Sequence, residues 1–169
     1  MTFPAGPFYH GSYRDYPMGF RFTGGGQAYH EEWIFLPCYE ALHLHRPAEK
    51  IAHQDAVFMC EKPEHIEPCG GATERLILIR PSGEIQRHDN RWGQHIADMI
   101  DEGREIDHPE VAQACLSYWQ GEPCGEGEPL WEYLAREARV IACCDFCDPD
   151  PITLLASFDT QAQDNDPTI

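Results

Sequence analysis

Two kinds of material are scarce in this chain: long apolar runs and basic residues. No stretch approaches the roughly 18 apolar residues of a membrane-spanning helix, and the sequence does not open with the basic region and apolar run of a secretory signal peptide. We therefore expect a soluble, cytoplasmic protein with no membrane partner. Lysine and arginine total 12 against 29 aspartate and glutamate residues, which gives a formal net charge of -17. Such a chain repels the phosphate backbone of DNA and RNA, so we do not expect nucleic acid as its partner.

The acidic excess itself has two interpretations. It keeps the protein soluble, or it forms a binding surface for a basic partner, which includes mimicry of nucleic acid. Charge alone does not separate the two.

The length and apolar content predict one globular domain. A chain of 169 residues with 42% hydrophobic residues has enough material for one core and too little for two. We place this domain at residues 1–147. Residues 148–169 are rich in Asp, Pro, Gln and Thr and are expected to form an acidic, loosely packed C-terminal tail.

The eight cysteines are expected to be reduced thiols, because the chain carries no sign of secretion. Cys143, Cys144 and Cys147 include a C-x-x-C pair that offers two zinc ligands, but a structural zinc site takes four and no second such pair exists. His30 and Glu32 form the H-x-E of a zinc deaminase without the P-C-x-x-C that such enzymes also require. A glycine-rich phosphate loop and a dinucleotide-binding fingerprint are both missing.

The apolar pattern predicts an α+β fold of short strands and helices. One broken helix, or two short ones, is expected within residues 28–47, because Pro37 interrupts an otherwise helical period. Two amphipathic helices are expected between residues 91 and 119, the second beginning at His108-Pro109. Strands are expected at residues 7–10, 19–26, 55–60 and 137–146, and two more within residues 74–88, joined by a Pro-Ser-Gly turn.

Residues 6–12, GPFYHGS, raise the question of a ligand site. A strand that ends in His10 and Gly11 places an imidazole at its terminus, and the glycine lets a ligand approach the backbone closely. The competing interpretation is a turn glycine beside an ordinary surface histidine.

Four segments, in the same order, resemble motifs of the ADP-ribosyltransferase fold, in particular the small bacterial rifampin ADP-ribosyltransferase type. GPFYHGS resembles its first strand, with an aromatic-His-Gly sequence. AVFMCEKPEHI (56–66) resembles its second strand and the helix start that follows. LILIRPSGEIQRHDN (76–90) is similar to its next strand, Pro-small-Gly turn and acidic segment, and EYLAREARVIACCD (132–145) resembles its closing strand.

The resemblance implies a nicotinamide site at the first motif. His10 would bond a hydroxyl of the nicotinamide-side ribose, the backbone of Gly11 would hold the carboxamide, and Ser12 would support it. Phe58 stands where the family usually has a tyrosine that stacks on the nicotinamide. Tyr29 is the alternative stacking ring.

The resemblance also implies an acidic catalytic residue. Glu132, just before the last strand, matches the wider fold, and Asp89 is the alternative because the rifampin-modifying relatives carry an aspartate after the Pro-small-Gly turn. A carboxylate aimed at the ribose stabilises the positive charge that develops as the bond to nicotinamide breaks. Because NAD is anionic, Arg14 and Arg21 are candidates for binding its pyrophosphate. Their alternative is surface pairing with acidic neighbours such as Asp15 or Glu31.

The fold implied is a single α+β domain with a split central sheet and surrounding helices. The function implied is an NAD-dependent mono-ADP-ribosyltransferase that moves ADP-ribose to a protein or small-molecule acceptor and releases nicotinamide. The alternative function is a catalytically degenerate acidic binding or inhibitor protein that occupies the basic surface of a partner, because a fold does not fix an activity.

Overall fold

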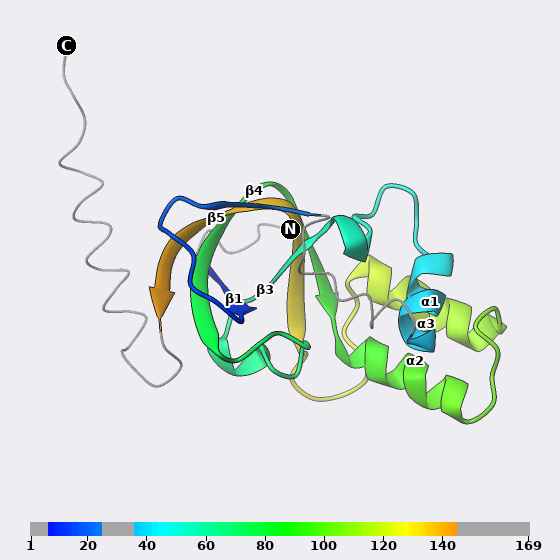
Figure 1. Cartoon of the computed structure of the whole chain (residues 1–169). Helices are drawn as coiled ribbons and strands as arrows, with labels where there is room; N and C mark the ends of the chain where they lie inside the picture. The colour runs from blue at the N-terminus through cyan, green and yellow to red at the C-terminus, as the bar shows by residue number, and fades with distance from the viewer. Residues whose placement is uncertain (1–6, 25–35, 145–169) are drawn as a thin grey trace, which may run out of the picture.

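The computed structural model describes residues 7–24 and 36–144, and these form an α+β fold as expected (Figure 1). They comprise three α-helices and a five-stranded antiparallel sheet. The helices are α1 (Pro37–Leu44), α2 (Arg91–Asp101) and α3 (Pro109–Gln120), and the strands are β1 (Phe8–Ser12), β2 (Arg21–Thr23), β3 (Val57–Cys60), β4 (Arg75–Asp89) and β5 (Trp131–Cys144). Within these ranges no helix is long and apolar enough to cross a membrane.

The sheet closes on itself through its two longest strands. Its order is β2-β5-β3-β1-β4, and β4 pairs with β5 again. Figure 1 shows β4 and β5 curving around the shorter β1 and β3. The strands described here form one sheet rather than the split sheet expected from the resemblance. The nearest thing to a split lies between β1 and β3, which share a single register pair, Tyr9 with Cys60, and then diverge.

The expectation of two strands and a turn within residues 74–88 is wrong, because β4 is continuous. Pro81 and Ser82 stay in register with Ala138 and Glu137 of β5. The ladder is irregular between Ser82 and Ile85, and Gly83 between them has φ 80°. The Pro-Ser-Gly sequence therefore makes a bulge in one long strand, and pairing with β5 continues on both sides of it.

The two helices expected between residues 91 and 119 are confirmed as α2 and α3. His108 is the N-cap of α3, where its Nδ1 accepts from the backbone N–H of Glu110 at 3.3 Å. Pro109 occupies the first turn, where its missing N–H removes no helical hydrogen bond. Residues 28–35 of the expected broken helix lie outside the described residues, and α1 begins at Pro37. The proposed tail at 148–169 lies outside them as well.

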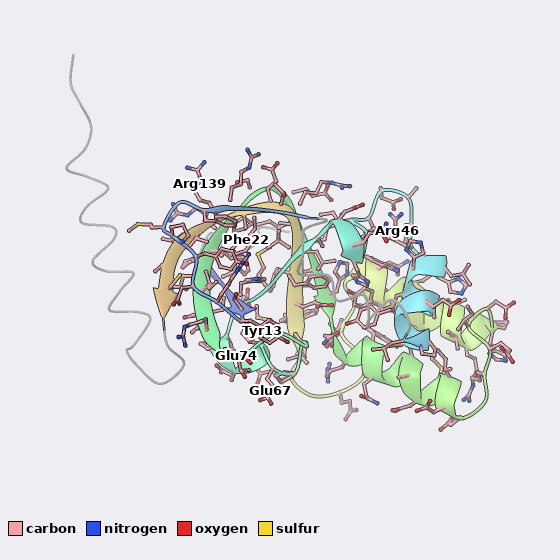
Figure 2. All side chains as sticks on the ribbon, in the orientation of Figure 1. Tyr13, Phe22, Arg46, Glu67, Glu74 and Arg139 are labelled. Carbon is pink, nitrogen blue, oxygen red and sulfur yellow. The ribbon has the colours of Figure 1, made fainter. Side chains whose placement is uncertain are left out.

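Two apolar clusters make up most of the core, one on each face of β5. Leu134 packs with Leu42, Ile96 and Trp119 of the three helices. Tyr133, the preceding residue, packs inside the curled sheet with residues of β1, β3 and β4. Because side chains alternate along a strand, Glu132 shares the helix-facing side of β5 with Leu134. Figure 2 shows that charged side chains such as Glu67, Glu74 and Arg139 lie on the outer surface instead.

Candidate functional site

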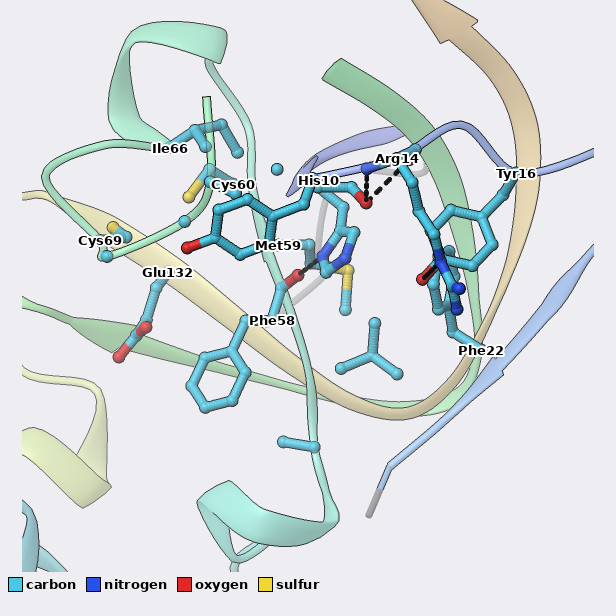
Figure 3. Close-up of a pocket in the computed structure, with 18 of the residues that line it drawn as sticks. His10, Arg14, Tyr16, Phe22, Phe58, Met59, Cys60, Ile66, Cys69 and Glu132 are labelled. Carbon is cyan, nitrogen blue, oxygen red and sulfur yellow. Dashed lines mark hydrogen bonds between the residues drawn. The ribbon is translucent and has the colours of Figure 1, made fainter. Parts of the chain in front are cut away.

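A cavity of about 460 Å³ opens beside the point where β1 and β3 diverge. Figure 3 shows Glu132 on one side of it, Arg14, Tyr16 and Phe22 on the other, and His10 between them. The cavity brings together most of the site residues predicted from the sequence: His10, Gly11, Ser12, Arg14, Arg21, Phe58 and Glu132. Asp89 does not line it, and Tyr29 lies outside the described residues.

His10 spans the opening between the two strands. Its Nδ1 lies 2.8 Å from the carbonyl oxygen of Phe58, and since a carbonyl only accepts, the ring donates from Nδ1–H. Burial lowers the pKa of His10, although the bond to the Phe58 carbonyl opposes this shift. The neutral ring therefore keeps its proton on Nδ1 and leaves Nε2 as an acceptor.

Gly11 is required first by the protein's own packing. A Cβ at this position would lie 2.1 Å from the carbonyl oxygen of Ala72 and 2.5 Å from Cγ2 of Ile66. The glycine thus lets the 66–72 segment lie directly against β1, and this segment forms one wall of the cavity. Beyond Tyr9, β1 has no register pair with β3, so its backbone borders the opening.

The hydroxyl of Ser12 is already occupied by a local turn. It donates to the carbonyl of Arg14 at 2.9 Å and accepts from the Arg14 amide at 3.2 Å. Ser12 therefore shapes the exit of the chain from β1, and its support of a bound carboxamide stays a prediction.

Both predicted arginines line the cavity and both are exposed. Arg14 lies over the ring of Tyr16, 5.0 Å from its centroid, and its Nε donates to the Tyr16 hydroxyl. Arg21 forms an ion pair with Glu137 on the neighbouring strand β5. The pairing with Asp15 considered from the sequence is not found, because Asp15 pairs with Arg75 at 3.1 Å.

An aromatic group on the same side of the cavity was not predicted. The rings of Tyr16, Phe20 and Phe22 lie 4.7 to 5.2 Å apart, and the His10 ring lies 5.0 Å from that of Phe22. The signal was present as four aromatic residues between positions 13 and 22. Aromatic faces beside an arginine suit a flat ligand that carries negative charge.

Glu132 is 4% exposed and lines this cavity together with a second one of about 750 Å³ between β5 and the helices. Its Oε1 accepts a hydrogen bond from the hydroxyl of Tyr118 at 2.8 Å. Burial raises the pKa of Glu132 to about 7, the nearby charge of Asp89 acts in the same direction, and the Tyr118 bond opposes them. A carboxyl with such a pKa changes its protonation near neutral pH, as general acids and bases do.

The hydroxyl of Tyr118 also lies 2.7 Å from Nε2 of His53. Burial lowers the pKa of His53 to about 3, so its ring is neutral. His88 stacks on the Tyr118 ring at 4.5 Å, and its Nδ1–H donates to the Tyr118 backbone carbonyl at 2.8 Å. The apolar period of the sequence predicts the helix that carries Tyr118, but it does not predict these polar partners.

Asp89, the alternative acidic residue, has a different task. Its carboxylate accepts from Nε and Nη2 of Arg91 and from the backbone amides of Cys124 and Leu130, at 2.7 to 3.1 Å. Burial raises the pKa of Asp89, but these hydrogen bonds outweigh it and the net shift is downward. Asp89 therefore anchors the chain between α3 and β5.

Within the described residues, no group of three or more His, Cys, Asp or Glu side chains is arranged to hold a metal ion. The six cysteines described there are free thiols. Cys143 is exposed, and its Sγ–H donates to the backbone carbonyl of Tyr16 at 3.0 Å. The side chain of Cys144 lies outside the described part of the chain, and so do Cys147, His30 and Glu32.

No protein-family model matches this chain, and neither a curated protein nor a solved structure matches it. The cavity and the residues that line it are therefore the basis for assigning a function.

Proposed function

We propose that this protein is an NAD-dependent mono-ADP-ribosyltransferase, which transfers ADP-ribose to a protein or small-molecule acceptor and releases nicotinamide. The assignment of the sheet to the ADP-ribosyltransferase type is part of the proposal. The observation that carries it is that one cavity is lined by His10, Gly11, Phe58 and the buried carboxyl of Glu132. Its volume of about 460 Å³ is within the range of small-molecule sites.

The groups around His10 suit the nicotinamide end of NAD. Nε2 of the neutral imidazole accepts a hydrogen bond from a ribose hydroxyl. The backbone beside Gly11 can bond the carboxamide, since β1 borders the cavity there without a register partner in β3. Phe58, which also lines the cavity, offers a ring on which nicotinamide can stack.

Glu132 supplies the charge that the reaction requires. As the glycosidic bond breaks, its electron pair leaves with nicotinamide and positive charge develops on the ribose. An ionised Glu132 stabilises that charge more in the transition state than in the ground state, which lowers the barrier. The acceptor then bonds to the ribose carbon, and its proton passes to Glu132 and on to solvent.

The arginines support binding of the phosphates. Arg14 and Arg21 line the cavity on a protein whose net charge of -17 otherwise repels an anionic ligand. Guanidinium groups bind phosphate oxygens in a bidentate manner. Arg21 must share its charge with Glu137, so Arg14 is the better placed of the two.

The test is calorimetric titration with NAD combined with an assay of nicotinamide release. We expect saturable binding that His10→Ala weakens by about tenfold or more, and turnover that Glu132→Gln lowers by a factor of roughly 100 to 1,000 while NAD still binds. No binding at millimolar NAD would reject the enzyme and favour the acidic binding or inhibitor protein.

A further inference from the structure

A buried chain of hydrogen bonds stands behind the proposed catalytic carboxyl. The Tyr118 hydroxyl lies 2.8 Å from Oε1 of Glu132 and 2.7 Å from Nε2 of His53. The three residues are 1%, 4% and 5% exposed, respectively. They come from α3, β5 and the short 3₁₀ helix His53–Asp55, so only the folded chain brings them together.

The direction of each hydrogen bond among His53, Tyr118 and Glu132 follows from the groups that form it. An ionised carboxylate only accepts, so the Tyr118 hydroxyl donates to Glu132. The Tyr118 oxygen is then free to accept, and neutral His53 donates to it from Nε2–H. The ring of His53 is held in place by Trp119, which stacks on it at 4.9 Å.

Burying Glu132 in this way lowers the stability of the core. Glu132 lies beside a cluster of leucine, isoleucine, valine and aromatic side chains, and among the described residues it has no ion-pair partner. Burying a carboxyl without a cation is unfavourable, and a well-packed apolar residue would avoid this penalty. Perturbed ionisable groups in a cavity wall are typical of functional sites.

We propose that Tyr118, oriented by His53, is a positioning residue for Glu132. Tyr118 holds Oε1 and keeps the carboxylate available, while Oε2, which has no hydrogen-bond partner among the described residues, is left for a substrate in the smaller cavity. The effect of Tyr118 on catalysis rests on the proposed function. Its effect on the position and ionisation of the Glu132 carboxyl does not.

Of the groups that face Glu132, Tyr118 is the one that stabilises the ionised form of the Glu132 carboxyl. From β4, the charge of Asp89 opposes ionisation of Glu132. His88, on the same strand, is neutral because burial lowers its pKa to about 4, and His53 is neutral as well. Cys60 of β3 and Cys69 of the neighbouring loop are buried thiols, and a hydrogen bond to Cys60 together with burial raises the pKa of Cys69. None of these groups supplies a positive charge.

The first test is the pH dependence of nicotinamide release from NAD in Tyr118→Phe. Loss of a hydrogen bond to a charged group raises the pKa of Glu132 by about one unit. We therefore expect kcat to fall about fivefold at pH 7, where the wild-type carboxyl is half ionised, and to recover near pH 9, with KM for NAD unchanged. A loss of activity that is the same at every pH would show a merely structural role and overturn the inference.

Tyr133→Phe is the matched control. Tyr133 is the next residue on β5, it is also buried, and its hydroxyl donates to a different glutamate, Glu61, at 2.6 Å. The control therefore removes a tyrosine–glutamate bond of the same kind without touching Glu132. We expect the pH profile of this variant to match the wild type.

The second test does not require NAD. Protein labelled with carbon-13 at glutamate carboxyl carbons is titrated by NMR, and Glu132→Gln identifies the resonance of Glu132. We expect its midpoint to rise by about one pH unit in Tyr118→Phe and by less in His53→Leu, which leaves the tyrosine hydroxyl in place but unoriented. An unchanged midpoint in both variants overturns the inference.

The two readouts separate the two proposals. If the midpoint rises but wild-type protein releases no nicotinamide, Tyr118 positions Glu132 and the proposed function is wrong. If nicotinamide is released but neither the midpoint nor the pH profile moves, the function stands and the role of Tyr118 is rejected. Should Tyr118→Phe not fold, as judged by circular dichroism, His53→Leu carries both measurements.

Discussion

The Nδ1–H of His10 donates to the carbonyl of Phe58 across the place where β1 and β3 part, at 2.8 Å. This side-chain bond substitutes for the backbone pairing that the two strands have lost. It also fixes which ring nitrogen is free, because a neutral imidazole with its proton on Nδ1 accepts at Nε2. The same bond thus joins the two strands at the cavity wall and leaves an acceptor nitrogen on His10.

His10→Ala is predicted to weaken NAD binding by about tenfold or more, since it removes both the acceptor for the ribose and the brace between the strands. Calorimetric titration measures the change in Kd. The matched control is His45→Ala, because Nε2 of His45 also bonds a backbone carbonyl, that of Ile106, at 2.9 Å and does not line the cavity. Equal affinities in His10→Ala and the control would contradict the assignment.

The two candidate carboxyls are predicted to respond in opposite ways. Asp89→Asn should lower the free energy of unfolding by about 2 to 4 kcal/mol, because it disturbs buried hydrogen bonds to Arg91, Cys124 and Leu130. Its turnover per folded molecule should stay near that of the wild type. Glu132→Gln should instead lower turnover and leave the free energy of unfolding near that of the wild type. Urea unfolding and nicotinamide release, measured on both variants, decide the matter, and a catalytic defect confined to Asp89→Asn would move the acidic role to that residue.

The sequence could place His10 and Gly11 together as candidate site residues because one strand carries both, and both line the cavity. Only the resemblance favours Glu132 over Asp89. The residue pattern does not separate them, although the two residues lie on neighbouring strands, where Glu132 pairs with His88 and Asp89 pairs with Trp131. A shift of one residue along a strand moves a side chain to the opposite face. The choice therefore depends on the register between β4 and β5, which no local pattern reveals.

Long-range partners explain the remaining differences. The Pro-Ser-Gly sequence is typical of a turn, and only the length of β5 turns it into a bulge. Tyr118 follows the apolar period of α3 and is indeed in the core, but its hydroxyl meets His53, 65 residues away. Periodicity predicts which side of a helix is buried, and it does not predict which polar atoms meet there.

Gly11→Ala is predicted to damage the site by displacing its wall. The new methyl group would collide with the backbone of Ala72, which cannot rotate away as a flexible side chain would. We expect the free energy of unfolding to fall by about 1 to 3 kcal/mol and NAD affinity to fall with it. Gly93→Ala, within α2, is the control, since its Cβ would approach nothing closer than 3.5 Å and alanine favours a helix. Unchanged stability in Gly11→Ala would show that residues 66–72 can move without penalty.

Acidification is predicted to destabilise the fold between about pH 6.5 and pH 4.5. The pKa values of His53 and His88 are lowered to about 3 and about 4, so in this range both rings are protonated in the unfolded chain and neutral in the folded one. Glu132 opposes them, because its pKa is raised to about 7 and it holds a proton when folded that it has lost when unfolded. Two protons favour the unfolded state and one favours the folded state. The net uptake of at least one proton on unfolding lowers stability by at least about 1.4 kcal/mol for each pH unit of acidification.

Urea unfolding at several pH values tests this balance, and Glu132→Gln sharpens it. Glutamine removes the one proton that favours the folded state, so the fall in stability should become steeper by about 1.4 kcal/mol for each pH unit in the same range. Burial also lowers the pKa of His10, so His10 adds to the loss of stability on acidification in the wild type and in Glu132→Gln alike. A stability that is flat from pH 6.5 to 4.5 in both would mean that His53 and His88 are not buried as neutral rings, and the hydrogen-bond directions assigned around Tyr118 would then be wrong as well.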